Sequence, residues 1–326
     1  MPADETRPIT FDAHAPAHQP TSPPSHPPLR LVVNGDDFGY SEAINAAIVR
    51  CHVEGILTSA TLLVNQPATR AAIRSARDHP TLGVGWHVNL TEGGPILPPR
   101  EVPTLTDRHG HFRPIGAQIG GLLRGTTRAD EVERELRAQL AIQLDAGLQP
   151  THVDGHLHAH AFPRVLPIVL RLMAQHGILA LRSPALGAWL PPRSSGAAIE
   201  NPWGALRPGS PLAPLLGSRG LLGAAGWLAP HLERARLRQL RLAGFVCADR
   251  LFDAARFLAA PDPPAALVAA LTAGDGLAEI MAHPAWNRDA ARGAAEVALL
   301  TDPRLRTALD ERGVRRVYYG QPTAER

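Results

Sequence analysis

The sequence predicts an α/β protein in which seven or eight parallel strands form a closed or nearly closed barrel with a helical insertion. Three observations support this fold class. Short apolar runs rich in Val, Ile and Leu alternate with segments of helical periodicity over most of the 326 residues. The number of strand–helix steps favours a barrel over a doubly wound sheet. Acidic and imidazole side chains recur where the runs end, and the carboxyl ends of barrel strands meet at one mouth.

The first three steps are predicted between residues 29 and 88. Ser41 can cap the first helix, and Gly55 ends it. The inner face of this helix is expected to carry Ile44, Ile48 and Val53. The strands are expected at 29–34, 58–64 and 82–88, and the second helix at 67–77.

The middle of the chain resumes the alternation after a long irregular segment. Residues 89–125 are rich in Gly and Pro and are expected to form a loop; loops of this length are often functional. Thr127–Asp130 resembles a capping box that opens a helix. One face of that helix carries Val132, Leu136, Leu140 and Leu144. The next expected elements are a strand at 150–154, a helix at 163–176 and a strand at 178–181.

We expect a single domain at residues 29–320. Two regions do not follow its alternation of strands and helices. Residues 1–28 are rich in Pro, His and Ser and are predicted to be a disordered tail. Residues 184–242 are rich in Pro, Gly and Leu, end in a basic helical segment and are interpreted as an insertion. The later strands are expected at 244–247, 277–281 and 316–319, and the later helices at 263–273 and 294–312.

Composition excludes several classes of protein. The net charge is only +3, and no long basic run with interleaved aromatic residues occurs, so nucleic acid is not an expected partner. Two cysteines, Cys51 and Cys247, are too few for a disulfide framework and indicate reduced thiols in a cytoplasmic protein. The sequence shows neither a signal-peptide pattern nor an apolar run of membrane-spanning length.

Acidic and imidazole side chains fall at the ends of four predicted strands. An adjacent pair of aspartates is usually a turn or a helix cap, and a lone histidine is usually structural. Four such features on four strands are harder to explain structurally, because groups of this kind around one mouth need a cation to join them. These residues are Asp36, Asp37, His87, Asp154, His156 and His283.

The residue types at these ends suit hydrolysis of an amide. One carboxylate and two imidazoles can hold a divalent ion with open positions for water and substrate. Such an ion lowers the pKa of bound water and polarises a carbonyl oxygen. A second aspartate beside the ion can accept the proton of that water, and a histidine across the site can protonate the departing amine.

Four motifs, at residues 33–39, 85–91, 151–156 and 282–284, resemble those of the YdjC-like carbohydrate deacetylases. Val33–Gly39 is similar to the signature N-A-D-D-F-G, and Gly85–Thr91 is similar to G-x-H-x-x-L-T. Thr151–His156 is similar to T-H-x-D-x-H, and Ala282–Pro284 matches a late H-P motif. The motifs occur in family order, and the resemblance covers residues 29–183 and 243–320.

The resemblance implies a TIM-barrel-like fold and one divalent metal ion, Mg²⁺ or Zn²⁺. It implies that the metal ligands are Asp37, His87 and His156. It also implies that Asp36 is the general base and His283 the general acid. The chain departs from the family pattern at Gly35, where alanine is usual, and has Gly155–His158 where many members carry a denser histidine run.

Three further residues are candidates for contact with the substrate. His158 and His160 alternate after His156, as in a strand or an extended turn. They can contact substrate or support a metal ligand, or they can lie in an exposed loop with no function. Asp154, in the same motif, is grouped with them as a substrate-binding residue.

The expected substrate is an N-acetylglucosamine-type sugar, and the resemblance narrows it further. Residues 184–244 are similar to the insertion of the hopanoid-biosynthesis-associated members, in which an Arg- and Leu-rich stretch precedes an element that here is Asp249–Phe252. This implies a hopanoid glycolipid. A helix with apolar and Arg-bearing surfaces can lie at the inner surface of a membrane, or it can pack as a lid over the barrel.

Several alternatives stay open at this point. The substrate can instead be a soluble chito-oligosaccharide, and a homodimer is kept open as an assembly. A metal-dependent phosphoesterase is disfavoured because few basic residues stand at the strand ends to hold a phosphate. A non-catalytic sugar-binding or membrane-binding protein is disfavoured because every expected ligand and the expected base are present.

Overall fold

The computed structural model describes residues 29–162, 164–182, 237–286 and 288–321. The expected tail at 1–28 and most of the expected insertion lie outside these ranges.

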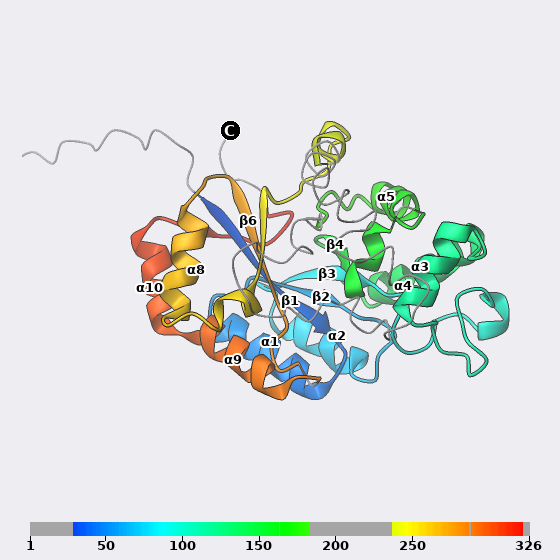
Figure 1. Cartoon of the computed structure of the whole chain (residues 1–326), viewed down its shortest axis with the longest axis horizontal. Coiled ribbons are helices and arrows are strands. Elements are labelled where there is room, and N and C mark those ends of the chain that lie inside the picture. The colour runs from blue at the N-terminus through cyan, green and yellow to red at the C-terminus, as the bar shows by residue number, and fades with distance from the viewer. Residues whose placement is uncertain (1–28, 163, 183–236, 287, 322–326) are drawn as a thin grey trace, which may run out of the picture.

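A parallel sheet forms the centre of the molecule (Figure 1). Its strands follow the order β4-β3-β2-β1-β6-β5, and β7 pairs with β1. In β1 the run Leu31–Phe38 is buried throughout, as expected of a strand covered on both faces. The strands are β1 (Arg30–Phe38), β2 (Ser59–Leu62), β3 (Gly83–Val88), β4 (Val153–Gly155), β5 (Arg250–Asp253), β6 (Leu277–Ala282) and β7 (Arg315–Arg316).

The sheet is a half-barrel. Beyond β4 the ladder continues through single parallel bridges, from Val153 to Leu181 and from Ala180 to Val246. The strands predicted at 178–181 and 244–247 are therefore reduced to these bridges. The prediction of a parallel, barrel-like α/β fold is confirmed, whereas the strands of the described residues do not form a full TIM barrel.

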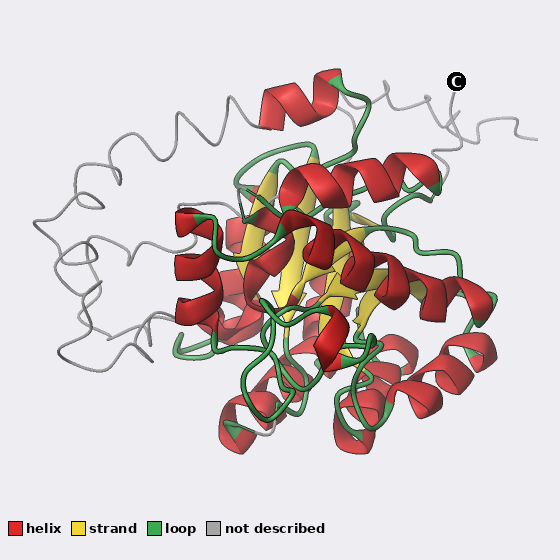
Figure 2. Ribbon diagram, turned by 90° about the vertical axis from the view of Figure 1, so that its right-hand side faces the viewer, coloured by secondary structure: helices red, strands yellow, loops and turns green. Residues whose placement is uncertain are grey.

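Helices pack around the outside of the strands (Figure 2). Helices α8, α9 and α10 gather at one end of the molecule, and α3, α4 and α5 gather at the other (Figure 1). The helices are α1 (Glu42–Val53), α2 (Thr69–Asp78), α3 (Ile115–Arg124), α4 (Ala129–Asp145), α5 (Leu166–Gln175), α8 (Pro263–Thr272), α9 (Ala290–Thr301) and α10 (Pro303–Glu311). Short 3₁₀ helices are η1 (Pro99–Glu101), η2 (His156–Ala161) and η4 (Ala254–Phe257).

Three helix predictions were wrong in detail. The single helix expected at 294–312 is two helices, because Pro303 cannot continue α9 and Asp302 caps α10 through its side chain. The loop expected at 89–125 contains α3, which begins after Pro114. The expected capping box at the start of α4 is not formed, since its N-cap is Arg128 and makes no side-chain cap bond.

The first helix follows its prediction except at its end. The Ser41 hydroxyl accepts the backbone N–H of Ile44 and so caps α1, as expected. Ile44 and Ile48 are buried, but Val53 is 59% exposed. Val53 is nine positions after Ile44, about half a turn around the helix, so it lies on the opposite face.

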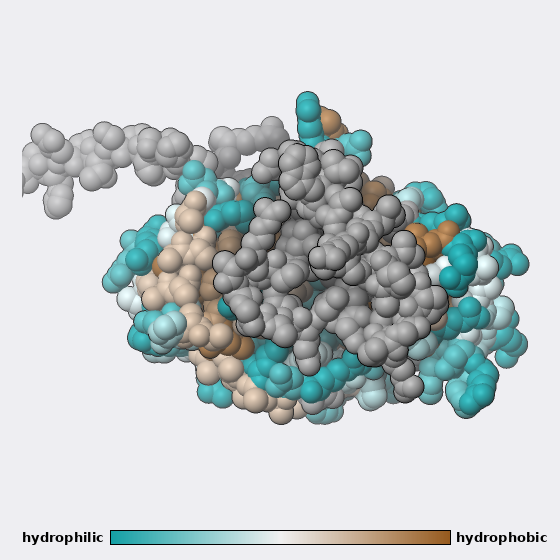
Figure 3. Space-filling view, in the orientation of Figure 1, coloured by the Kyte–Doolittle hydropathy of each residue, from teal (hydrophilic) through white to brown (hydrophobic). Residues whose placement is uncertain are grey.

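The exposed surface differs between the two ends of the molecule. On the face shown in Figure 3, apolar side chains gather over α8 and α9, and the end occupied by α3 and α4 is mostly hydrophilic. No described helix is long and apolar enough to cross a bilayer.

Candidate metal centre and active site

The parallel register brings the predicted strand-end residues to one edge of the sheet. His87 of β3 is paired in register with Asp154 of β4. Asp36 and Asp37 lie at the end of β1, and His283 directly follows β6, the neighbour of β1. His156 begins η2 immediately after β4. Segments far apart in the chain therefore place their acidic and imidazole groups together.

Asp37, His87 and His156 form a buried cluster that could hold a metal ion. The Asp37 Oδ1 atom lies 3.2 Å from His87 Nε2 and 2.8 Å from His156 Nδ1. One ligand atom from each of the three residues lies within 4.8 Å of the others. Burial would raise the pKa of Asp37, but the charges and hydrogen bonds of His156 and His87 outweigh it and hold that pKa well below its usual value.

Asp154 lies behind His87 and fixes its orientation. The His87 Nδ1–H donates to Asp154 Oδ1 at 2.6 Å, which leaves His87 Nε2 directed at Asp37. Although burial opposes it, the Asp154 carboxylate raises the pKa of His87 to about 10. Asp154 is fully buried and also accepts from Thr61 and Arg182. It was predicted to bind substrate, but its position suits support of a metal ligand.

Asp36 lies beside this cluster in a bidentate ion pair with Arg182. Arg182 Nη1 and Nη2 donate to the two carboxylate oxygens of Asp36 at 2.6 and 2.7 Å. The Asn34 side chain donates a further hydrogen bond to Asp36 Oδ1 at 2.8 Å. His283 faces the other oxygen, with its Nε2 atom 3.9 Å from Asp36 Oδ2. The expected base and the expected acid thus stand next to each other.

Sequence reasoning missed Arg182, Glu279 and Tyr319. The fully buried Arg182 joins three carboxylates, because its Nε also donates to Glu279 Oε1 at 2.7 Å. Tyr319 donates its hydroxyl to the other Glu279 oxygen at 2.6 Å. A signal was available, since Arg182 closes one predicted apolar strand and Glu279 interrupts another, and charges buried in strands require partners.

His158 and His160, the two later histidines of η2, differ in burial. His160 is fully buried, and its Nε2 is hydrogen-bonded to the Arg182 carbonyl oxygen at 2.9 Å, so the exposed-loop alternative is wrong for this residue. His158 is half-buried, and its ring centroid lies 6.2 Å from that of His160.

Backbone strain is concentrated at the same edge of the sheet. Four non-glycine residues of the described chain have a positive φ: Asp37, Leu157, His158 and Ala285. Each is a motif residue or lies within two residues of one. Such conformations cost about 1–3 kcal/mol each and persist where the surroundings impose them, often at functional sites. Asp37, with a φ of 65°, thus combines a strained backbone with a place in the candidate metal cluster.

The donor set fits a divalent cation. Asp36, Asp37 and Asp154 are buried, and within the described ranges Arg182 is the one buried guanidinium that pairs with Asp36 and Asp154. The His156 Nε2 atom is buried and has no hydrogen-bond partner among the described residues. Two imidazole nitrogens and a carboxylate oxygen form a ligand set that zinc accepts readily, while magnesium prefers oxygen ligands.

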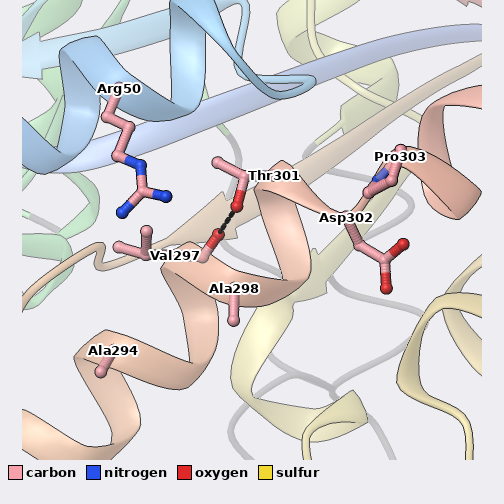
Figure 4. Close-up of a pocket in the computed structure, with 7 residues that line it drawn as sticks. All are labelled: Arg50, Ala294, Val297, Ala298, Thr301, Asp302 and Pro303. Carbon is pink, nitrogen blue, oxygen red and sulfur yellow. Dashed lines mark hydrogen bonds between the residues drawn. The ribbon is translucent and has the colours of Figure 1, made fainter.

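A separate hollow of about 440 Å³ lies on the outer face of α9 (Figure 4). It is lined by residues of α9 together with Arg50 of α1, Asp302 and Pro303. None of the strand-end residues described above lines it, and the buried side chains of α9, such as Glu296 and Leu300, belong to its opposite face. We therefore do not assign this hollow to the site.

Comparisons with known proteins agree with the fold and the motifs. The chain is 46% identical to a carbohydrate deacetylase of Brevibacillus brevis over 162 residues, which are 50% of this chain and 60% of that protein. It is 44% identical to a chitooligosaccharide deacetylase of Salmonella newport over 154 residues, 47% of this chain and 58% of that protein. The matches thus span about three fifths of the length of these relatives.

A solved structure and a family profile extend the similarity to most of the chain. The structure is an Enterococcus faecalis protein named for a presumed role in cellobiose-phosphate cleavage. It shares 24% identity with a TM-score of 0.66 and covers 90% of this chain and 98% of its own, so it supports the fold alone. The profile of the family described as YdjC-like protein matches residues 30–311. The chain therefore belongs to the YdjC-like protein family.

Proposed function

We propose that this protein is a metal-dependent hydrolase that removes the N-acetyl group from an N-acetylglucosamine-type sugar. One observation carries the proposal: a buried Asp37–His87–His156 cluster lies beside Asp36 and His283, which face each other at 3.9 Å. The deacetylase names of two relatives support the sugar and the reaction.

In this proposal Asp37, His87 and His156 hold the ion, and Zn²⁺ suits their donor set better than Mg²⁺. The bound ion supplies Lewis acidity that polarises the acetyl carbonyl and acidifies water.

Asp36 and His283 divide the proton transfers of the reaction. Asp36 accepts a proton as the water oxygen bonds to the acetyl carbon. As the carbon–nitrogen bond breaks, His283 gives a proton to the sugar nitrogen, and the products are acetate and a free amino sugar. A carboxylate can accept hydrogen bonds along about four lone-pair directions. Hydrogen bonds from Arg182 and Asn34 occupy three of those of Asp36, so one remains to accept the proton.

The alternatives fit the site less well. A phosphoesterase needs a cation free to hold phosphate, whereas Arg182, the buried guanidinium at these strand ends, already binds Asp36, Asp154 and Glu279. A non-catalytic sugar-binding or membrane-binding protein would not need both a base and an acid beside a metal cluster.

A narrower proposal is that the sugar is carried by a hopanoid lipid. The protein would then work in the cytoplasm at the inner membrane surface. Its support is the sequence resemblance alone, and the segment at 183–236 lies outside the described residues.

Arg250 belongs to the element Asp249–Phe252 that follows this segment. Its guanidinium donates to the carbonyl oxygens of Ala270, Leu271 and Gly274, so it fixes β5 against α8. The alternative is a soluble chito-oligosaccharide, and either substrate is compatible with a monomer or a homodimer.

Acetate release tests the proposal directly. The metal-free protein is reloaded with Zn²⁺ or Mg²⁺ and incubated with N,N′-diacetylchitobiose or with an N-acetylglucosaminyl hopanoid in liposomes. We expect acetate release that chelator abolishes and Zn²⁺ restores. Phosphate-ester cleavage without acetate release would overturn the proposal. Equal turnover of the two sugars would reject the lipid-linked substrate.

A further inference from the structure

A buried relay connects the residue after the last strand to the expected base. Tyr319 lies three residues beyond β7 and outside the 30–311 range that the family profile matches. Its hydroxyl donates to Glu279, Glu279 accepts from Arg182, and Arg182 holds both oxygens of Asp36. Each of the four residues is at most 3% exposed. The relay therefore crosses the protein interior without a step through solvent.

The ring of Tyr319 also reaches Asp36 by a second path. It lies 4.8 Å, centroid to centroid, from the ring of His152. His152 Nε2 is hydrogen-bonded to Asn34 Oδ1, and the Asn34 amide donates to Asp36 Oδ1. Burial lowers the pKa of His152 to about 4, so His152 is neutral and its Nε2–H can donate to Asn34. Both paths from Tyr319 end on the same carboxylate.

Several contacts together fix the orientation of the Arg182 guanidinium. Arg182 Nε is directed at Glu279, and Nη1 is shared between Asp36 and Asp154. Its backbone N–H donates to Val153 and its carbonyl oxygen meets His160. Rotation of the guanidinium would break the pair with Asp36, so the Glu279 bond sets the angle at which Asp36 is held. The Tyr319 hydroxyl satisfies the Glu279 oxygen that Arg182 leaves unbound.

We propose that Tyr319 and Glu279 are positioning residues that orient the Asp36 carboxylate through Arg182. The inference rests on the proposed function only in naming Asp36 as the base. Neither residue touches the metal cluster, so loss of either should change turnover more than substrate affinity or metal affinity. Outer residues of this kind typically alter activity by about 10–100-fold when removed.

The experiment compares Tyr319→Phe with a matched control, Tyr318→Phe, at the neighbouring half-buried tyrosine. We expect Tyr319→Phe to lower kcat about tenfold, with KM and the calorimetric Kd for Zn²⁺ changed less than about threefold. Glu279→Gln should cost more, because it removes the charge facing Arg182. The double variant should be no worse than Glu279→Gln alone, since the two residues act in series.

A second readout does not depend on turnover. In the metal-free protein, the NMR resonance of the Arg182 Nε–H, assigned by its loss in Arg182→Lys, should shift in Tyr319→Phe and stay in place in Tyr318→Phe. Unchanged kcat and an unchanged resonance in folded Tyr319→Phe would overturn the inference. The inference would also be overturned if Tyr319→Phe and Tyr318→Phe lost kcat equally and each loss matched a fall in melting temperature. If the parent releases no acetate with any metal, the proposed function fails, and the resonance alone decides the relay.

Discussion

Of the three clusters of candidate metal ligands among the described residues, two that share no member differ in how their charge is balanced. Asp37, His87 and His156 are buried and have no guanidinium within their cluster in the described structure. The second cluster is formed by Asp253, His283 and Glu296 and is only partly buried. There Arg292 pairs with Glu296 at 2.8 Å and with Asp253 at 3.5 Å.

The comparison teaches how a metal site can be distinguished from an ion-pair network with similar residues. Where the protein supplies its own cation, as Arg292 does, the carboxylates already have a counter-charge and hydrogen bonds. Where carboxylate and imidazole atoms point at one another without such a cation, a metal ion is the group that satisfies them. We therefore expect one tightly bound ion per chain, at the first cluster.

The largest expected effect comes from replacing one histidine of each cluster with glutamine and comparing the two variants. His87→Gln should weaken Zn²⁺ binding by more than about a hundredfold and abolish turnover, because even supporting residues cost 10–100-fold. His283→Gln should keep Zn²⁺ affinity within about threefold yet lower kcat by about 10²–10⁴, as loss of a general acid does. Calorimetric titration and acetate release measure the two effects. Strong Zn²⁺ binding by His87→Gln would exclude the first cluster as the metal site.

The next effect distinguishes the two aspartates that Arg182 holds. Asp36→Asn should retain Zn²⁺ and lose about 10²–10⁴ in kcat, because an amide cannot accept the proton of water. Asp154→Asn should instead weaken Zn²⁺ binding by about 10–100-fold, because the carboxylate that orients His87 is lost. The same two measurements apply. Parental turnover by Asp36→Asn would show that another residue is the base.

A smaller effect is expected at the second cluster. Arg292→Gln leaves Glu296 and Asp253 without their counter-charge and removes the guanidinium that lies 5.3 Å from the Trp286 ring. We expect a lower melting temperature and a second, weaker metal ion by native mass spectrometry. Arg288→Gln, which removes the exposed pair with Glu92 at the same rim, is the control and should keep one ion. Two tightly bound ions in the parent would contradict the assignment of Arg292 as the built-in cation.

The smallest effect is expected for Asp130 at the start of α4, which pairs with Arg128 and Arg134. Unlike the charges of the two clusters, these side chains are exposed to solvent. Arg128, and then Arg134, lower the pKa of Asp130 from 3.8 to about 2. A depressed pKa contributes stability above the ordinary value, and that contribution is lost as the pH falls through about 2. Asp130→Asn should therefore lower the melting temperature slightly at pH 6 and less at pH 3. Because solvent screens this pair, a large change at pH 6 would contradict the contrast with the buried clusters.

The sequence predicted the fold in outline because hydrophobic periodicity reports burial. The strands at 82–88 and 277–281 agree closely with β3 and β6, since both are buried along their whole length or nearly so. The weak strand at 178–181 was overestimated because its pairing is decided by distant partners. The helix α3 was missed because its composition is rich in Gly and follows Pro114, and only tertiary packing makes it helical.

The sequence predicted which ligand candidates meet but not what holds them. Asp37, His87 and His156 could be selected because they follow strands and occur in motifs. The residues that support them could not be selected, because Arg182 and Tyr319 act through pairings over long sequence distances. Arg182 and Asp36, for example, are separated by 146 positions. The sequence pattern also does not say on which side of a metal ligand a neighbouring carboxylate lies. The substrate-binding role predicted for Asp154 stays a prediction, and the structure shows this residue buried behind His87.

The anchoring of Arg182 has a consequence for how this protein can diversify. Its backbone is held on both sides, by Val153 through the N–H and by His160 through the carbonyl oxygen, and its side chain ends among three carboxylates. We therefore expect changes of length or composition immediately after residue 182 to leave the ion pair between Arg182 and Asp36 in place.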